Sequence, residues 1–322
     1  MDGGVPFFSI GVTTYNRPGM LKECIQSLLA QSFGDFEVIV GNDYVAVPVT
    51  AASVGITDSR ITFVNHEKNL GEVDNMNTLL RRSRGRFFTW LADDDMYSPA
   101  YLETMRRVLT KEKNARAFFC QYAYGHSFEE RIERYNGPVK TYNGRSFLLE
   151  YLARNIRLSG CYGMFEREYM LSEGGMRKMG KGSSIYSDVL MAIRAGLLEW
   201  VGFVPEPLIF FRTHQDSLSN SVGMLEDYVD CQSDLMKHSM DVFQSAALSD
   251  DRDKYLNLTL RWCLRDFCSV MKRGGRWDGA QFKKWFTMEK MYLCKMRCGR
   301  MLLLLHLLRR LTGLRIDFCR RQ

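Results

Sequence analysis

Short apolar runs alternate with stretches of helical periodicity over roughly the first 120 residues. Strand-like runs occupy residues 7–12, 36–40, 61–64, 87–91 and 117–120. Between them, apolar residues recur at helical spacing after Pro18, across 72–84 and from Pro99 to Leu109. Strands that alternate with helices of this length predict βαβ units and a mainly parallel sheet. We therefore expect an α/β fold of the Rossmann type, with helices flanking the sheet.

The pattern changes near residue 223, after which no strand-like run follows. Amphipathic helices are expected over residues 225–243, 255–271 and 282–311, where apolar side chains recur every three or four positions. The sequence therefore predicts two parts, an α/β domain over residues 1–222 and a helical region over 223–322.

Polar side chains follow three of the predicted strands at the point where each strand ends. They are Thr13, Thr14 and Asn16 after the first strand, Asn42 and Asp43 after the second, and Asp93, Asp94 and Asp95 after the fourth. Parallel strands bring their carboxyl ends to one edge of the sheet, where open α/β sheets bind ligands. We expect these side chains to line one functional rim.

The three adjacent carboxylates at residues 93–95 are the sharpest chemical feature of the chain. They repel one another, so a bare cluster at a strand end is costly unless a cation binds there. Carboxylate oxygens suit Mg²⁺ or Mn²⁺, which complete their coordination with water and substrate phosphates. The alternative, a solvated acidic turn, is disfavoured by the apolar strand before the cluster and the helical pattern that follows Pro99.

Charge is distributed unevenly along the 322 residues. The net charge is +7, yet residues 1–222 hold 25 basic and 25 acidic residues, whereas 254–322 hold 17 basic and 4 acidic ones. Basic and aromatic residues interleave there, which favours reversible contact with an anionic membrane through about residues 276–310. Packing in a homodimer or against the first domain is the alternative. No nucleic-acid-binding module is recognisable, so we expect no nucleic-acid partner.

Composition indicates the class of protein and the cellular compartment in which it is expected. Apolar residues make up 46% and charged residues 25% of the chain, as in ordinary globular proteins. No apolar run is long enough to span a membrane, and the first twelve residues lack the features of a signal peptide. The nine cysteines include no C-x-x-C pair, which disfavours a zinc site. We expect a cytoplasmic protein, or one peripheral on the inner face of the membrane.

Five motif-bearing segments occur in a fixed order. They are the T-Y-N-R turn in 9–18, the helix and strand at 28–40, the N-x-G…N segment at 69–77, the acidic run in 89–99, and the R-x-H-x-x-S-x-S segment at 212–219. Together they resemble family 2 glycosyltransferases with the GT-A fold, over about residues 6–220. The resemblance implies a nucleotide-sugar half at about 1–110 and an acceptor half at about 111–222.

The resemblance also implies roles for individual residues. Asp94 matches the metal-ligating acid, with Asp95 beside it, and Asp43 matches the acid that hydrogen-bonds the nucleobase. The positions implied in nucleotide-sugar binding are Thr13, Thr14, Tyr15, Asn16, Arg17, Asp43, Asn69, Gly71, Asn77, Asp93, Arg212 and His214. The chain departs from the family at Asn42, which replaces the first of two acids, and at 44–48, where a small Gly-Ser pair is common.

Asp188 is the candidate catalytic base. It lies at the start of an apolar helical run, where the family places a carboxylate base, and Ser187 replaces the first acid of the usual pair. A helix-capping role, contributing about 0.5–2 kcal/mol, is the alternative reading, and the two roles are compatible. For His214, a purely structural role is the alternative to a contact with the donor's phosphates.

The expected activity is transfer of a sugar from a UDP- or dTDP-type donor to a hydroxyl of a saccharide or lipid-linked saccharide, in surface polysaccharide or glycolipid synthesis. It is expected to depend on Mn²⁺ or Mg²⁺ and to invert the anomeric centre. A non-catalytic GT-A module for nucleotide binding or assembly is one alternative, which the intact acids disfavour. A sugar-phosphate nucleotidyltransferase is another, disfavoured because residues 13–16 lack a Gly-rich turn.

Overall fold

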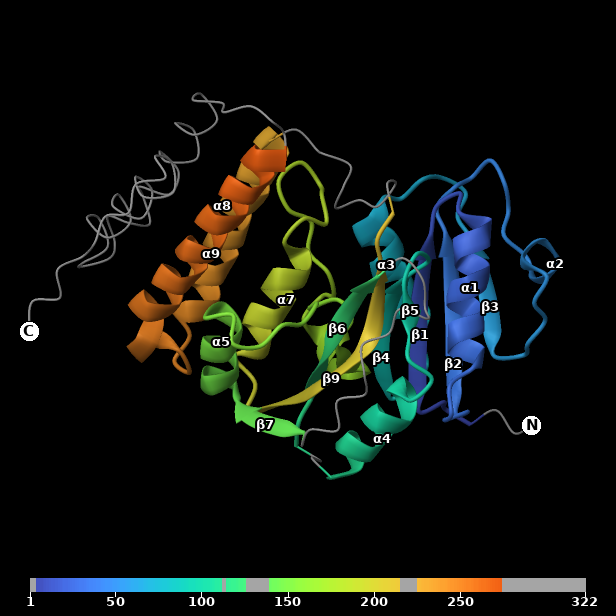
Figure 1. The fold of residues 1–322 in the computed structure, drawn as a ribbon, viewed down its shortest axis with the longest axis horizontal. Helices are drawn as coiled ribbons and strands as arrows, with labels where there is room; N and C mark the ends of the chain where they lie inside the picture. Colours follow the sequence, from blue (N-terminus) through green and yellow to red (C-terminus); the bar gives the residue numbers. More distant parts are fainter. Residues whose placement is uncertain (1–3, 112–113, 126–138, 215–224, 274–322) are drawn as a thin grey trace, which may run out of the picture. The chain divides into compact units, whose positions relative to one another are not determined.

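The structure is a computed structural model that describes residues 4–111, 114–125, 139–214 and 225–273. Its contacts divide the chain into two units, residues 1–221 and 222–322. Nine strands of the first unit form one sheet with the order β3-β2-β1-β4-β8-β6-β9-β5, and β7 pairs with β9 (Figure 1). The expected α/β fold with flanking helices is confirmed.

The first four strands of this sheet are parallel, and each coincides with an apolar run in the sequence. They are β1 (Phe8–Thr14), β2 (Phe36–Asn42), β3 (Ile61–Asn65) and β4 (Phe87–Ala92). The helices between and after them are α1 (Pro18–Leu29), α2 (Ala51–Val54), α3 (Glu72–Arg82) and α4 (Tyr101–Lys111). Pro18 lies in the first turn of α1, where its missing N–H removes no helical hydrogen bond.

The rest of the sheet is mixed and was predicted only in part. Its strands are β5 (Met96–Tyr97), β6 (Ala117–Gly125), β7 (Lys140–Asn143), β8 (Met164–Glu166) and β9 (Trp200–Arg212). Its helices are α5 (Gly144–Leu152), α6 (Arg167–Ser172) and α7 (Ser187–Ala195). Strand β8 runs antiparallel between β4 and β6, whereas β9 lies parallel to β6. Of these strands, only β6 was expected from the sequence.

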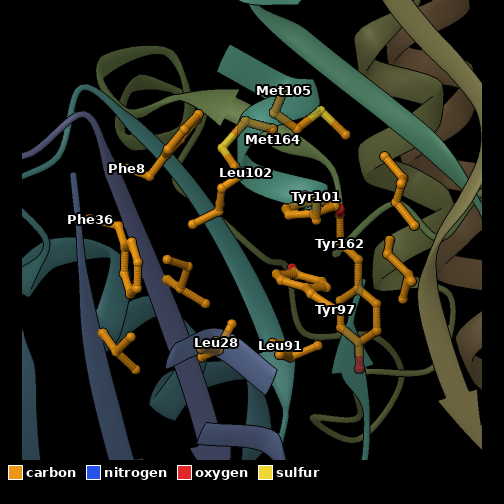
Figure 2. Packing of buried hydrophobic residues seen from close by; sticks show 14 of the residues in the cluster. Phe8, Leu28, Phe36, Leu91, Tyr97, Tyr101, Leu102, Met105, Tyr162 and Met164 are labelled. Carbon is orange, nitrogen blue, oxygen red and sulfur yellow. The ribbon is translucent and has the colours of Figure 1, made fainter. Parts of the chain in front are cut away.

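The main apolar core lies between one face of the parallel strands and helices α1 and α4 (Figure 2). Phe8 and Leu28 are fully buried in it, and the rings of Tyr97 and Tyr101 stack with their centroids 3.9 Å apart. Helix α3 covers the opposite face, where a Cβ on Gly11 would lie only 3.0 Å from Leu79. The strand ends therefore project from a sheet that is packed on both faces.

Residues 225–273, the described part of the second unit, form two long helices, α8 (Leu225–Phe243) and α9 (Arg252–Arg273), joined through the short 3₁₀ helix η2 (Ser249–Asp251). The rings of Phe243 and Tyr255 meet at 5.3 Å, and the buried Gln232 amide donates to the Cys263 carbonyl. No helix among the described residues has the length and apolar character to cross a membrane. The predicted helix at 282–311 and the membrane contact at 276–310 lie outside the described residues.

Candidate active site

The carboxyl ends of three parallel strands meet at one edge of the sheet. Thr14 at the end of β1 pairs with Asn42 of β2, and Thr13 pairs with Ala92 of β4. Beyond the strands, the Asp43 N–H donates to the Thr14 carbonyl at 3.1 Å. The Asp93 N–H donates to the Thr13 carbonyl, also at 3.1 Å. This backbone pairing brings the first and second strand ends to the acidic turn at 93–95.

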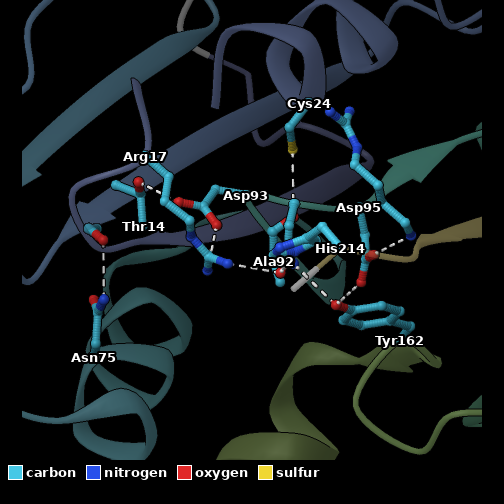
Figure 3. A network of polar contacts seen from close by, with 12 residues as sticks. Thr14, Arg17, Cys24, Asn75, Ala92, Asp93, Asp95, Tyr162 and His214 are labelled. Atoms are coloured by element: carbon cyan, nitrogen blue, oxygen red, sulfur yellow. Dashed lines mark hydrogen bonds and ion pairs between the residues drawn. The ribbon is translucent and has the colours of Figure 1, made fainter. Parts of the chain in front are cut away.

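Arg17 bridges the first two acids of that turn (Figure 3). Its Nη2 lies 2.6 Å from Asp93 Oδ1, and its Nη1 lies 2.7 Å from Asp94 Oδ2. The Thr14 hydroxyl donates to the other oxygen of Asp93 at 2.6 Å, and the Asp93 side chain is fully buried. Asn16, the residue before Arg17, has a left-handed φ of 54°. Residues of the T-Y-N-R turn thus partly neutralise the acidic turn.

Asp95 is held by groups from two distant segments. The Tyr162 hydroxyl donates to Asp95 Oδ2 at 2.6 Å, and the Arg212 N–H donates to Oδ1 at 3.0 Å. The same Tyr162 oxygen accepts the Ala92 N–H at 3.2 Å. Tyr162 is only 6% exposed and lies just before β8, where no sequence motif marked it. It is the principal member of this site that sequence reasoning missed.

Burial dominates the electrostatics of the turn. It raises the pKa of Asp93 to about 6, although Arg17 and the Thr14 hydroxyl oppose the shift. Burial also raises the pKa of Asp95 to about 8, and the neighbouring Asp94 charge adds to the effect. A cation bound at the turn would reverse this tendency by favouring the ionised carboxylates.

The closing segment brings His214 to the acidic turn, but it directs the side chain of Arg212 elsewhere. His214 Nε2 lies 3.0 Å from Asp94 Oδ2. The guanidinium of Arg212 instead pairs with Glu23 of α1 at 2.6 Å. Asp94 keeps 13% of its side chain exposed, which makes it the most accessible of the three acids.

Asp43 and the segment after β3 form the second part of the rim. The buried Asp43 carboxylate accepts the N–H groups of Leu70 and Gly71 at 2.6 and 2.8 Å. The Asn69 side chain also accepts the Gly71 N–H at 2.8 Å, and Gly71 has a φ of 80°, which favours glycine. The ring of Tyr15 lies edge-on to that of Tyr44, with centroids 5.2 Å apart. Asp43 therefore fixes the loop at 69–71.

Two buried asparagines shape this region, and only one drew attention in the sequence. The Asn42 amide donates to the carbonyls of Tyr44 and Val47 at 3.2 and 2.9 Å, so it holds the loop that departs from the family. The Asn75 amide of α3 donates to the Gly41 carbonyl at 2.9 Å. A Cβ on Gly41 would lie 2.2 Å from Asn75 Oδ1, so glycine permits this approach.

Asn77 and Asp188 lie on helices α3 and α7. Both amide atoms of Asn77 pair with the backbone of Met176, at 2.8 and 2.9 Å. Asp188 is half-buried in the first turn of α7, whose N-cap residue is Tyr186. The prediction of Asp188 as the N-cap residue is therefore wrong, because the N-cap lies two residues earlier.

The donor set of the acidic turn suits a hard divalent cation in part. Among the described residues, no three His, Cys, Asp or Glu side chains are grouped to hold a metal ion. Arg17 and His214 both contact Oδ2 of Asp94, whose side chain is 13% exposed, and both oxygens of Asp95 accept hydrogen bonds. An ion with one or two protein carboxylates, completed by water and substrate phosphates, fits this arrangement.

The fold is that of the GT-A glycosyltransferases, and solved structures share it. Residues 1–349 of Staphylococcus aureus TarS, in complex with UDP-GlcNAc, match with a TM-score of 0.64 and 15% identity, over 87% of this chain and 79% of that chain. The mannosyltransferase PcManGT from Pyrobaculum calidifontis, in complex with GDP-Man and Mn²⁺, matches with a TM-score of 0.53 and 15% identity, over 96% and 85%. At this identity the likeness establishes the fold alone.

The model of Glycosyl transferase family 2 matches residues 9–198, more than half of the chain, so the chain belongs to that family. An uncharacterized glycosyltransferase of Rickettsia typhi is 30% identical over 118 residues, 36% of this chain and 36% of the relative. The Bacillus subtilis glycosyltransferase YwdF is 33% identical over 125 residues, 38% of this chain and 44% of the relative. The match spans less than half the length of each relative.

Proposed function

We propose that this family 2 glycosyltransferase is a divalent-cation-dependent, inverting enzyme that uses a UDP- or dTDP-sugar. Its acceptor would be a hydroxyl of a saccharide or lipid-linked saccharide, in surface polysaccharide or glycolipid synthesis. One observation carries the proposal: an acidic turn at the carboxyl end of β4, bridged by Arg17, with Asp94 its most accessible carboxylate. The turn adjoins the strand ends that carry Thr14 and Asp43.

Asp94 and Asp95 would hold the cation. Mn²⁺ or Mg²⁺, when bound, would neutralise the negative charge that grows on the departing diphosphate. Arg17 and His214 already contact Asp94, so both donors stand where a phosphate group near that carboxylate could accept from them. Asp93 would act through Arg17, because its side chain is fully buried and paired.

The nucleoside would bind at the ends of β1 and β2. Asp43 is buried beside the 69–71 loop, and the half-exposed ring of Tyr15 adjoins Tyr44 at the same rim. A carboxylate can accept the imide N–H of uracil or thymine, which supports a UDP- or dTDP-type donor. The UDP-GlcNAc complex of the similarly folded TarS is compatible with this choice.

Asp188 would accept the proton of the incoming hydroxyl. The acceptor oxygen would then form a bond to the anomeric carbon as the bond from that carbon to the diphosphate oxygen breaks. Because the hydroxyl attacks opposite the leaving group, a single displacement inverts the anomeric configuration. The half-buried Asp188 stands in the first turn of α7, two residues after the N-cap residue Tyr186.

A thermal-shift panel of UDP-, dTDP- and GDP-sugars, with and without Mn²⁺, tests this proposal. A ligand at 100 times its dissociation constant adds about 2.7 kcal/mol of stability, enough to rank the donors. A UDP- or dTDP-sugar should stabilise the protein most, and only when Mn²⁺ or Mg²⁺ is present. If no nucleotide sugar stabilises it, or if the metal has no influence, the proposal is refuted. Stabilisation without turnover would favour a non-catalytic binding module.

A further inference from the structure

Four aromatic side chains form a connected row on the β6–β9 side of the acidic turn. Tyr122 and Tyr124 lie on β6, Phe211 lies on β9, and Tyr162 precedes β8. The Phe211 ring is the centre of the row: its centroid lies 4.8 Å from Tyr122, 5.5 Å from Tyr124 and 5.2 Å from Tyr162. The rings of Tyr162 and Phe211 are stacked, at an interplanar angle of 18°.

The aromatic row is fixed to Asp95 by two independent connections. At one end, the Tyr162 hydroxyl donates to the Asp95 carboxylate. Along the strands, Gly125 pairs with Arg212, whose N–H donates to the same carboxylate. Tyr162 belongs to the main apolar core (Figure 2), and the Tyr101 hydroxyl donates to its carbonyl at 3.3 Å, so the buried end of the row is anchored. The rings are therefore connected to the acidic turn at two points.

Tyr124 is the exposed end of the row. Its side chain is 66% exposed, whereas Ala123 on the opposite face of β6 is buried with Met96 and Phe210. Partial burial and the neighbouring Tyr122 hydroxyl raise the pKa of Tyr124, and the charges of Asp95 and Asp188 add to the shift. Both acids therefore lie within electrostatic reach of this ring. An exposed aromatic ring with one side supported is typical of a ligand contact.

We propose that Tyr124, supported by Phe211, is an acceptor subsite that stacks against a sugar ring of a saccharide acceptor. The inference rests on the proposed function. A pyranose presents an apolar face of C–H groups to an aromatic ring, while its hydroxyls stay free to approach Asp188. The nucleobase is not the expected occupant. The nucleoside would bind at β1 and β2, whereas Tyr124 and Phe211 lie on β6 and β9, and the sheet order places β4 between these two pairs of strands.

Saturation-transfer difference NMR tests the subsite with three probes: the methyl β-glycosides of glucose, galactose and N-acetylglucosamine, at millimolar concentration. The full chain is used with UDP and Mg²⁺ present, because Mg²⁺ is diamagnetic and does not broaden the probe signals. The wild type and Tyr124→Phe should transfer saturation to the ring protons of at least one probe. Tyr124→Ala should reduce that signal about fivefold or more, because the stacking face is lost. Trp200→Ala is the matched control at the opposite end of β9, and it should leave the signal unchanged.

UDP binding, followed by thermal shift in the same samples, shows that each variant is folded and separates the two proposals. If UDP binds with Mg²⁺ but no glycoside receives saturation, the subsite is refuted and the donor site stands. An equal glycoside signal in Tyr124→Ala, or an equal loss in Trp200→Ala, would also overturn the subsite. Absence of UDP binding in the wild type would contradict the proposed UDP-type donor site, and the subsite with it.

Discussion

The hydroxyl of Tyr162 offers the most specific test of how the acidic turn is held. Tyr162→Phe removes one oxygen and keeps the ring that stacks on Phe211. Asp95 Oδ2 then loses a donor at 2.6 Å, and the Ala92 N–H loses an acceptor at 3.2 Å. A neutral hydrogen bond contributes about 0.5–1.5 kcal/mol, a bond to a charged group about 1.5–3, and an unsatisfied buried group costs about 1–3. We expect a total loss of about 2–4 kcal/mol.

The loss should grow with pH. Without metal, the pKa of Asp95 is about 8, so the carboxyl is mostly protonated at pH 6 and ionised at pH 9. The Tyr162 hydroxyl favours the ionised form, and its removal raises the Asp95 pKa further. An acid whose pKa is higher in the folded than in the unfolded protein lowers the free energy of unfolding once the pH exceeds the unfolded-state pKa. This loss of stability reaches its full size when the pH exceeds the folded-state pKa. The destabilisation by Tyr162→Phe should therefore be larger at pH 9 than at pH 6.

Urea denaturation of the metal-free protein at pH 6 and pH 9 measures this difference. Tyr101→Phe is the matched control, because its buried hydroxyl donates to a neutral group, the Tyr162 carbonyl, at 3.3 Å. The control should lose about 0.5–1.5 kcal/mol at both pH values. An equal loss at the two pH values for Tyr162→Phe, or the same pH trend in the control, would refute the reasoning.

Three further predictions concern the charged groups of the site. Asp188→Asn should lower turnover about 10²-fold or more while the donor dissociation constant stays unchanged, as steady-state kinetics and calorimetry would show; equal losses in both would exclude a base. Arg17→Gln should lower the free energy of unfolding by about 3–5 kcal/mol in urea denaturation, because Asp93 loses its cationic partner. The double variant with Asp93→Asn should recover part of that loss. Mn²⁺ affinity should rise between pH 6 and pH 8 in calorimetric titrations, because protons compete for Asp95; a flat profile would argue against Asp95 as a ligand.

Much of the fold could be predicted because the parallel strands are buried on both faces and read as continuous apolar runs. Strand β9 was missed because Pro205 and Pro207 interrupt it, and prolines normally argue against an inner strand. The ladder accommodates them through register shifts on either side of Gln121 in β6. Strands β5, β7 and β8 have only two to four residues, too few for a periodic pattern.

The site was predictable where its residues follow strands and unpredictable where they come from distant loops. Strand ends meet by topology, which is why Thr14 and Asp93 could be expected side by side. Tyr162 reaches Asp95 across 67 positions of sequence, with no motif to mark it. The pairing of Arg212 with Glu23 depends on the position of α1 against β9, which residue spacing does not specify. The domain limits and the membrane contact at 276–310 stay predictions.

The affinity of the protein for UDP, measured by calorimetry with and without Mn²⁺, tests the central claim most directly. Wild type and Asp94→Asn are compared, because Asp94 is the most accessible acid of the turn and the substitution keeps its size. We predict that the wild type binds UDP tightly only with Mn²⁺, and that Asp94→Asn loses this metal-dependent gain. Equal UDP affinity with and without Mn²⁺, or an undiminished gain in Asp94→Asn, would contradict a cation-dependent donor site at this turn.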